Sequence, residues 1–349
     1  MTPAGTTSLR YVLTLAALTV AVLALAVACL LLGSVSIDAR SVFDILMGRG
    51  SDNVAWEIIV LQSRLPMIVT AALAGAALSV AGLLLQTTFN NPLAGPSILG
   101  VSTGAGLGVA VVMLALGGSV GTIMGHNVGT YVATLFGALL GAGVVLVLLI
   151  AMSAIVRSAT MLLIVGILIS YLASSIISLL NSVASEEGVH SYVAWGFGNF
   201  QGVSLDQLPL YCSLIVIALV ATMLMVKPLN ALLLGTRYAQ NLGVDTHRTR
   251  NVLLLVTGVL TAVVTAYCGP IGFVGLVVPH IARLLLGTSN HSRLLPATML
   301  AGAAVTLLCT LLSVNGPHGV IPINAITPII GVPIIIYIIV NRHRIQYFN

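Results

Sequence analysis

Long apolar runs with almost no charge constrain this chain more than any other feature of its sequence. Only 6% of the 349 residues are charged, whereas a soluble protein carries about 25%. Backbone groups in lipid must be paired within the segment, and these runs do not alternate as barrel strands do, so we expect helices. A helix needs about 20 residues to cross a bilayer, and ten runs are close to that length: Tyr11–Leu32, Leu65–Leu85, Ile98–Leu116, Tyr131–Met152, Met161–Leu180, Leu208–Val226, Val252–Cys268, Ile271–Leu286, Leu294–Leu312 and Ala325–Val340. We therefore predict an all-α polytopic membrane protein, with residues 1–349 forming one domain of ten transmembrane helices.

The placement of charge tests this arrangement independently. With the N-terminus in the cytoplasm, ten of the thirteen basic residues fall on the cytoplasmic side: Arg10, Arg157, Lys227, Arg237, Arg248, Arg250, Arg283, Arg293, Arg342 and Arg344. Seven of the eight acids fall on the outer side: Asp38, Asp44, Asp52, Glu57, Glu186, Glu187 and Asp206. Cytoplasmic loops of membrane proteins carry an excess of Lys and Arg. We therefore expect both termini in the cytoplasm.

The predicted spans lack the groups that would supply energy. No acid lies inside a span, although buried carboxylates are common in proton-coupled carriers. The only lysine, Lys227, does not stand in the G-x-x-x-x-G-K-[ST] pattern of a phosphate-binding loop. An ATPase would therefore have to be a separate polypeptide. A sodium-coupled secondary carrier stays open, because such carriers also use backbone carbonyls.

We predict neither a catalytic site nor a metal site. No candidate catalytic pair occurs within the spans, which disfavours an intramembrane enzyme. His280 has no second metal-ligand candidate one helical turn away, where Arg283 and Leu284 stand. Its expected role is packing.

Small residues recur at helical spacing inside the runs, and they predict closely packed helices. A triplet that faintly resembles a dinucleotide-binding loop lies within a span with no strand before it, so packing is again the expected role. The residues concerned are Ala71, Gly75 and Ser79, then Gly137 and Gly141, and the triplet Gly104, Gly106 and Gly108.

The longest cytoplasmic segment, residues 227–250, carries an apolar stripe. Leu234, Tyr238 and Leu242 are four apart and share one face of a predicted short helix, bracketed by Gly235 and Gly243. An apolar face outside the bilayer needs a cover. A cytosolic partner and the lipid headgroups are the two alternatives.

A second cytoplasmic segment separates the second and third spans. It reads Asn90-Asn91-Pro92-Leu93-Ala94-Gly95-Pro96, and its prolines and glycine predict a sharp, ordered turn. A plain connector and a constriction at the inner end of a pathway are both compatible with this pattern.

At these motifs the sequence resembles the FecCD-type permease family, whose members import ferric siderophores, haem and vitamin B12. The resemblance covers nearly the whole chain in three ordered blocks. They are Arg64-Leu65-Pro66 through Gln86, Asn91-Pro92-Leu93-Ala94 and Ile98–Ala105; then Leu234-Gly235 through Leu242-Gly243-Val244; and Gly269-Pro270-Ile271-Gly272-Phe273-Val274-Gly275 through His280, with Arg293-Leu294-Leu295-Pro296.

The resemblance implies a type II ABC importer permease fold and a set of partners. These are a second copy of the chain, two cytosolic ABC ATPase subunits and an extracytoplasmic substrate-binding protein, in a multi-pass protein of the bacterial inner membrane. ATP and Mg²⁺ are expected on the ATPase, no cofactor on this chain, and no nucleic acid among its partners. The coupling contacts to the ATPase implied by the family are Leu234, Gly235, Arg237, Tyr238, Ala239, Leu242 and Gly243.

The resemblance also implies a cytoplasmic gate and a docking contact. Asn91, Leu93, Ala159 and Thr160 match positions that form the gate in the vitamin B12 importer. Arg64 matches a family arginine that meets acidic residues of the binding protein.

Three departures from the family pattern concern docking and the pathway. Met67 stands where a second docking arginine is usual, and Ser313 or a near neighbour replaces a third. Arg40 or Arg49 is the alternative docking contact. Asn324 replaces a usual glycine of the last helix, where it is expected to face the pathway.

These observations predict import of an iron complex, a ferric siderophore or haem, with cobalamin as the alternative within the family. The sequence does not separate these substrates. An ion-coupled secondary transporter is the alternative from another class.

Overall fold

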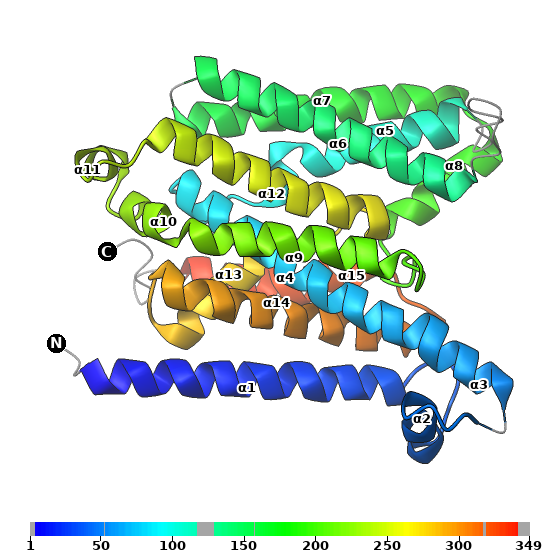
Figure 1. Ribbon diagram of the computed structural model, residues 1–349. Helices are drawn as coiled ribbons and strands as arrows, with labels where there is room; N and C mark the ends of the chain where they lie inside the picture. Colours follow the sequence, from blue (N-terminus) through cyan, green and yellow to red (C-terminus); the bar gives the residue numbers. More distant parts are fainter. Residues whose placement is uncertain (1–3, 52, 117–128, 157, 317–318, 341–349) are drawn as a thin grey trace.

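The computed structural model describes residues 4–51, 53–116, 129–156, 158–316 and 319–340, and within these ranges every regular element is helical. The long helices lie side by side in a single bundle, with α1 along one side and α6 and α7 along the other (Figure 1). The elements are α1 (Ala4–Leu31), α2 (Ala39–Leu46), α3 (Val54–Ile58), the π-helix η1 (Ile59–Arg64), α4 (Leu65–Thr88), the 3-10 helix η2 (Pro96–Leu99), α5 (Val101–Ala110), the π-helix η3 (Val111–Ala115), α6 (Thr130–Ile155), α7 (Ala159–Val183), α8 (Glu186–Gly196), α9 (Leu208–Leu224), α10 (Val226–Leu232), α11 (Thr236–Asn241), α12 (Thr246–Cys268), α13 (Val274–Leu286), α14 (His291–Val314) and α15 (Ile323–Val340).

The helices follow the predicted apolar runs. Six are long and apolar enough to cross a membrane, and the bent pair α9 and α10, with 56° between its two parts, makes a seventh when it is taken as one span. Three shorter apolar helices, Val101–Ala115, Val274–Leu286 and Ile323–Ile338, occupy the positions of the other three predicted runs. The all-helical multi-pass membrane fold is confirmed, whereas the count of ten crossings stays a prediction.

Helix α4 lies at the centre of the bundle and packs against α12, α13 and α14. Of the residues in its apolar stretch, 83% are buried, whereas only 6% of those in the apolar stretch of α1 are. Small residues permit this packing. A Cβ atom on Gly82 would lie 1.6 Å from the carbonyl oxygen of Gly275, and one on Gly75 would lie 2.2 Å from that of Gly302. The prediction of closely packed helices is therefore confirmed.

The glycines of α5 and α6 make a second close crossing. Cβ atoms on Gly104 and Gly108 would lie 2.7 Å and 1.8 Å from the carbonyl oxygens of Gly141 and Gly137. Gly104 and Gly108 of the triplet thus serve helix packing, as the absence of a preceding strand predicted, whereas Gly106 faces Tyr192 and Trp195 of α8.

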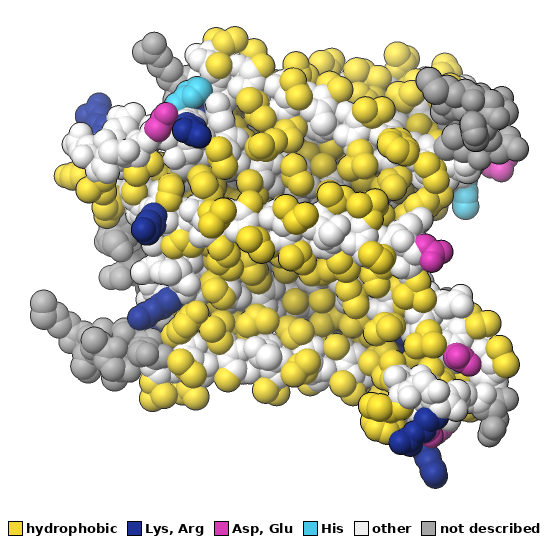
Figure 2. Space-filling model, in the orientation of Figure 1, with side chains coloured by type: hydrophobic (Ala, Val, Ile, Leu, Met, Phe, Trp, Pro, Cys, Tyr) yellow, Lys and Arg dark blue, Asp and Glu magenta, His cyan; other side chains and the backbone are white. Residues whose placement is uncertain are grey.

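Charged side chains gather at the two ends of the bundle, with an apolar surface between them (Figure 2). The end with α11 and the N-terminus carries basic residues, and the opposite end, with α2, α3 and α8, carries acids and the remaining exposed arginines. This separation agrees with the predicted charge partition, although Asp52, Arg157, Arg342 and Arg344 lie outside the described residues. The cytoplasmic location of the basic end stays a prediction.

Candidate functional site

The predicted coupling segment projects from the basic end as two short helices. Gly235 lies between α10 and α11 and interrupts the helical path with φ +95°, and Gly243 follows the end of α11 with φ +82°. Only glycine adopts such angles without strain, which explains both residues. The predicted short helix is thus found, but its bounds are Thr236–Asn241, so Leu234 and Leu242 flank it.

The apolar stripe of this segment is open to solvent. Leu234, Tyr238 and Leu242 are 60%, 68% and 65% exposed, and Arg237 is also exposed. Ala239, on the opposite side of α11, is fully buried. The segment therefore exposes an apolar face beyond the end of the bundle, with the cationic side chain of Arg237 beside it.

The coupling segment is tied firmly to the first turn of α12. Val244 N donates to Ala239 O at 3.0 Å, and Gln240 Nε2 donates to Thr246 Oγ1 at 3.1 Å. Asp245 caps α12 by accepting from Arg248 N at 2.9 Å. These bonds span the turn after α11, so they connect α11 directly to the start of α12.

The first predicted gate segment is the loop after α4. Asn91 N donates to Gln86 O at 3.0 Å, and the Asn91 side chain accepts from Leu93 N at 2.9 Å. Leu93 is exposed at the tip of the loop. The expected ordered turn is present, and Asn91 shapes it.

A buried cluster of polar side chains on α4 and α13 contacts and supports this loop. His280 Nε2 lies 2.8 Å from Pro92 O. Arg283 NH1 donates to Gln86 Oε1 at 2.6 Å, and Gln86 Nε2 donates to Leu276 O at 3.1 Å. Sequence analysis assigned His280 to packing and gave Gln86 and Arg283 no role in this cluster, although polar residues in apolar helices are a usable signal.

The second predicted gate segment is the start of α7. Ser158 caps the helix by accepting from Met161 N at 3.4 Å, and Ala159 and Thr160 form its first turn. Helix η2, which follows the first gate loop, packs on α7, with Gly166 close to the Leu99 backbone. The two segments thus belong to neighbouring elements, and their joint role as a gate stays a prediction.

A cavity of about 610 Å³ opens between α5, α7, α8 and α15. Asn324 lies in its wall, donates to Gly196 O at 2.9 Å and to Pro270 O at 2.5 Å, and accepts from Gly272 N at 3.2 Å. The described residues that line it are Ser97, Ser102, Thr103, Gly106, Ser174, Ile177, Ser178, Tyr192, Val193, Trp195, Gly196, Pro270, Ile271, Gly272, Phe273, Asn324 and Pro328. The polar side-chain groups of these described residues are hydroxyls, the amide of Asn324 and the indole N–H of Trp195, and none carries a formal charge.

Arg64 lies at the other end of the bundle, but its side chain is only 5% exposed. Its guanidinium donates to Leu30 O at 2.5 Å, to Leu31 O at 3.2 Å and to Val35 O. These carbonyls lie in and just after the last turn of α1, where no intrahelical donors exist. The geometry therefore gives Arg64 a structural role, and its docking contact stays a prediction.

The positions of the two missing docking arginines are also buried. Met67 accepts from Gln201 Nε2 at 3.5 Å, and Ser313 donates to Ile321 O at 2.6 Å. Both line a cavity of about 190 Å³ at this end of the bundle. In this chain the cavity holds no arginine among its described lining residues.

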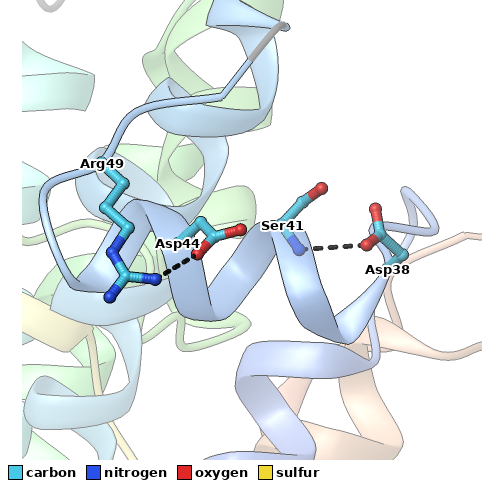
Figure 3. Close-up of polar contacts among 4 residues, drawn as sticks. All are labelled: Asp38, Ser41, Asp44 and Arg49. Atoms are coloured by element: carbon cyan, nitrogen blue, oxygen red, sulfur yellow. Dashed lines mark hydrogen bonds and ion pairs between the residues drawn. The ribbon is translucent and has the colours of Figure 1, made fainter.

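Charged side chains at the same end stand on α2 and the loop after it (Figure 3). Asp38 caps α2 by accepting from Ser41 N at 3.0 Å, and Asp44 pairs with Arg49 at 3.3 Å. Arg40 is exposed on the same helix. Arg40 is therefore open to a partner, whereas Arg49 is partly engaged within the chain.

Comparisons with known proteins show which family this architecture belongs to. The model of the FecCD transport family matches residues 19–341. An ABC transporter permease of Methanocaldococcus jannaschii is 33% identical over 88% of this chain and 90% of its own length, and the vitamin B12 import system permease BtuC of Citrobacter koseri is 34% identical over 82% and 84%. A solved transporter assigned to the metal-chelate type, in an inward-facing conformation, has a TM-score of 0.81 and 29% identity over 93% of this chain and 98% of its own. The chain thus belongs to the FecCD transport family and is a permease of the ABC importer class.

Proposed function

We propose that this chain carries an iron complex, a ferric siderophore or haem, from an extracytoplasmic binding protein into the cytoplasm. Two copies would enclose the pathway in the plasma membrane, and two cytosolic ATPase subunits would drive it. The observation that carries the proposal is the pairing of an uncharged cavity of about 610 Å³ with an exposed apolar coupling segment at the basic end.

The cavity suits a bulky chelate rather than a bare ion. Free metal ions bind to clustered anionic or imidazole ligands, and the described residues contain no group of three such side chains. Hydroxyls and apolar walls offer weak contacts to a molecule whose metal is already coordinated. A permease with weak contacts leaves substrate selection to the binding protein and releases the cargo easily.

The coupling segment suits a protein partner. Leu234, Tyr238 and Leu242 present an apolar stripe beyond the helix ends, with Arg237 beside it. Apolar anchors with an adjacent cation are typical of protein interfaces. Binding of ATP would close the ATPase pair and so move this segment. Access to the pathway would then change at the gate residues Asn91, Leu93, Ala159 and Thr160.

Cobalamin is the second candidate substrate. The similarity to BtuC, named for vitamin B12 import, covers 82% of this chain. Cobalamin is also a complex whose metal is already coordinated, so the uncharged lining of the cavity does not separate the two classes. The metal-chelate type of the solved relative favours neither over the other.

Uptake in proteoliposomes tests the proposal. The permease is reconstituted with its ATPase and binding protein, and ferric hydroxamate, haem and cyanocobalamin are supplied separately. We expect ATP-dependent uptake of one iron complex and no uptake with a catalytically dead ATPase. Uptake driven by an ion gradient alone would establish a secondary carrier, and selective cyanocobalamin uptake would replace iron with cobalamin.

A pair of variants tests the coupling surface. Leu242→Asp should abolish ATP-dependent uptake because it places a charge on the stripe. Met47→Asp, on a side chain 59% exposed at the opposite end, is the matched control and should leave coupling to the ATPase intact. Equal effects of both variants would remove the segment from the mechanism.

A further inference from the structure

Two polar links join the flanks of the coupling segment to α4 and α6, the helices that directly precede the two gate segments. We propose that these links, centred on His291 and Arg250, transmit movement of α11 to the two gate segments. The inference rests on the proposed function, since it assigns positioning residues to ATP-driven import.

The first link starts on α10, just before the coupling helix. Asn230 Oδ1 accepts from His291 N at 2.8 Å and lies 3.0 Å from His291 Nδ1. Because a carbonyl oxygen only accepts, the neutral imidazole carries its proton on Nδ1. Its Nε2 then accepts from the hydroxyl of Thr87, 2.8 Å away in the last turn of α4, when the single hydroxyl proton points to the ring rather than to Leu83 O at 3.1 Å.

This link ends at the first gate segment. Thr87 follows Gln86, whose carbonyl oxygen holds Asn91 N. His291 is fully buried and Thr87 is nearly so. A displacement of α10 therefore pulls on the end of α4 through directional bonds, which water does not replace.

The second link starts after the coupling helix, on α12. Arg250 donates to Ser153 Oγ at 2.9 Å, to Ser153 O at 2.5 Å and to Val156 O at 3.3 Å. Asn251 adds a bond, because its Oδ1 accepts from Ser153 Oγ at 2.6 Å. Arg250 thus satisfies carbonyls at the end of α6, three residues before Ala159.

The space between the links allows movement. A cavity of about 360 Å³ is lined by Thr88 of α4, Ser153 and Ala154 of α6, Ala159 of α7, Leu232 of α10, Thr236 and Gln240 of α11, and Thr246, His247 and Arg250 of α12. Both gate-bearing ends and the coupling helix therefore surround one opening. The packing there is loose, so the polar links carry the mechanical connection.

Variants of similar volume test each link. His291→Phe removes both bonds of the ring, and Arg250→Met removes the guanidinium. The matched controls are Thr306→Val, which removes a different bond from α14 to α4 (Thr306 Oγ1 to Ala71 O, 2.7 Å), and Arg10→Met, which removes an arginine from the end of α13. Substrate molecules imported per ATP hydrolysed are measured in proteoliposomes.

We expect the two link variants to lower this ratio about threefold or more and the two controls to leave it unchanged. Arg250→Lys should give an intermediate ratio, because an ammonium group does not reach three acceptors in a guanidinium's fork geometry. Asn230→Ala, on the half-buried α10, repeats the first test where His291→Phe does not assemble. Arg250→Lys repeats the second test where Arg250→Met does not assemble.

Unchanged ratios in assembled link variants, or equal losses in the controls, would overturn the links. Either result leaves ATP-dependent import by the unaltered permease intact. Absence of that import in the unaltered permease would instead overturn the proposed function. The two failures are therefore distinguishable.

Discussion

Replacement of Arg64 should unfold this protein more readily rather than weaken its binding to a partner. The guanidinium donates to three backbone carbonyls, those of Leu30, Leu31 and Val35, and its side chain is 5% exposed. Hydrogen bonds to a charged group contribute about 1.5–3 kcal/mol each. The cost of burying the charge offsets part of that sum, so Arg64→Ala should cost about 3–5 kcal/mol.

A docking role predicts a different magnitude in a different assay. An exposed ion pair contributes about 0–1 kcal/mol, and its loss would leave the stability of the isolated permease unchanged. Thermal unfolding of the purified chain in nanodiscs separates the two accounts. We expect Arg64→Ala to lower the unfolding midpoint on the order of 5 °C.

Arg49→Ala is the matched control. Arg49 also forms a short contact, 3.3 Å to Asp44, but its side chain is 70% exposed. It should shift the midpoint by less than about 1 °C, because solvent screens the pair. An Arg64→Ala midpoint equal to that of Arg49→Ala, with weakened capture of the binding protein, would refute the structural reading and restore the docking contact.

Three further outcomes follow from the structure. Gly82→Ala should destabilise the bundle by about 1–3 kcal/mol or more, since its Cβ would meet the Gly275 carbonyl oxygen at 1.6 Å, whereas Gly143→Ala, with nothing within 4 Å, should be neutral in the same unfolding assay. Gly235→Ala should strain the turn at φ +95° by about 1–2 kcal/mol and reduce imported substrate per ATP, and an unchanged ratio would argue against a fixed turn. Hydrogen bonds from the Ser41 side chain and backbone hold the pKa of Asp38 below its usual value, so the cap of α2 should be complete above the usual carboxyl pKa and lost as pH falls through the lowered one. Amide hydrogen exchange in α2 measures this loss, which Asp38→Asn should abolish.

The sequence predicted the parts of this fold that depend on local composition. Apolar runs located the helices because lipid requires a long uncharged segment wherever the chain crosses it. The stripe of Leu234, Tyr238 and Leu242 was found because four-residue spacing survives even in a short helix. The glycine crossings followed from small-residue spacing in the same way.

Helix bounds were less predictable because a helix does not end where a membrane does. The second run was expected to begin at Leu65, yet helical structure begins at Val54 and passes through the π-helix η1. Glu57, Gln62 and Ser63 make this stretch too polar for a span, but they do not prevent backbone pairing. Hydropathy reports the solvent around a helix, and it says little about the length of the helix.

The contacts of the polar residues depended on segments far apart in sequence. Arg64 bonds to carbonyls about thirty residues earlier, and Arg250 bonds to Ser153 about a hundred residues earlier. A motif fixes the identity of such a residue, but its partner is set by the folded bundle. For this reason the sequence did not show that Arg64 bonds to the end of α1, and it did not show the contacts of His291 and Arg250.

Three of the arginines have the same structural role, which is to donate hydrogen bonds to carbonyls at helix ends. Arg64, Arg10 and Arg250 donate to carbonyls at the ends of α1, α13 and α6. The last four carbonyls of a helix have no partners within it, and a cation there also complements the helix dipole. A guanidinium, with five donors, satisfies several such carbonyls at once. Because the donors of these side chains are engaged within the chain, we expect electrostatic contacts to a binding protein to involve exposed residues such as Arg40. Substitution of Arg40 should therefore slow association at low salt without lowering stability, and a stability loss there would show that it too holds a helix end.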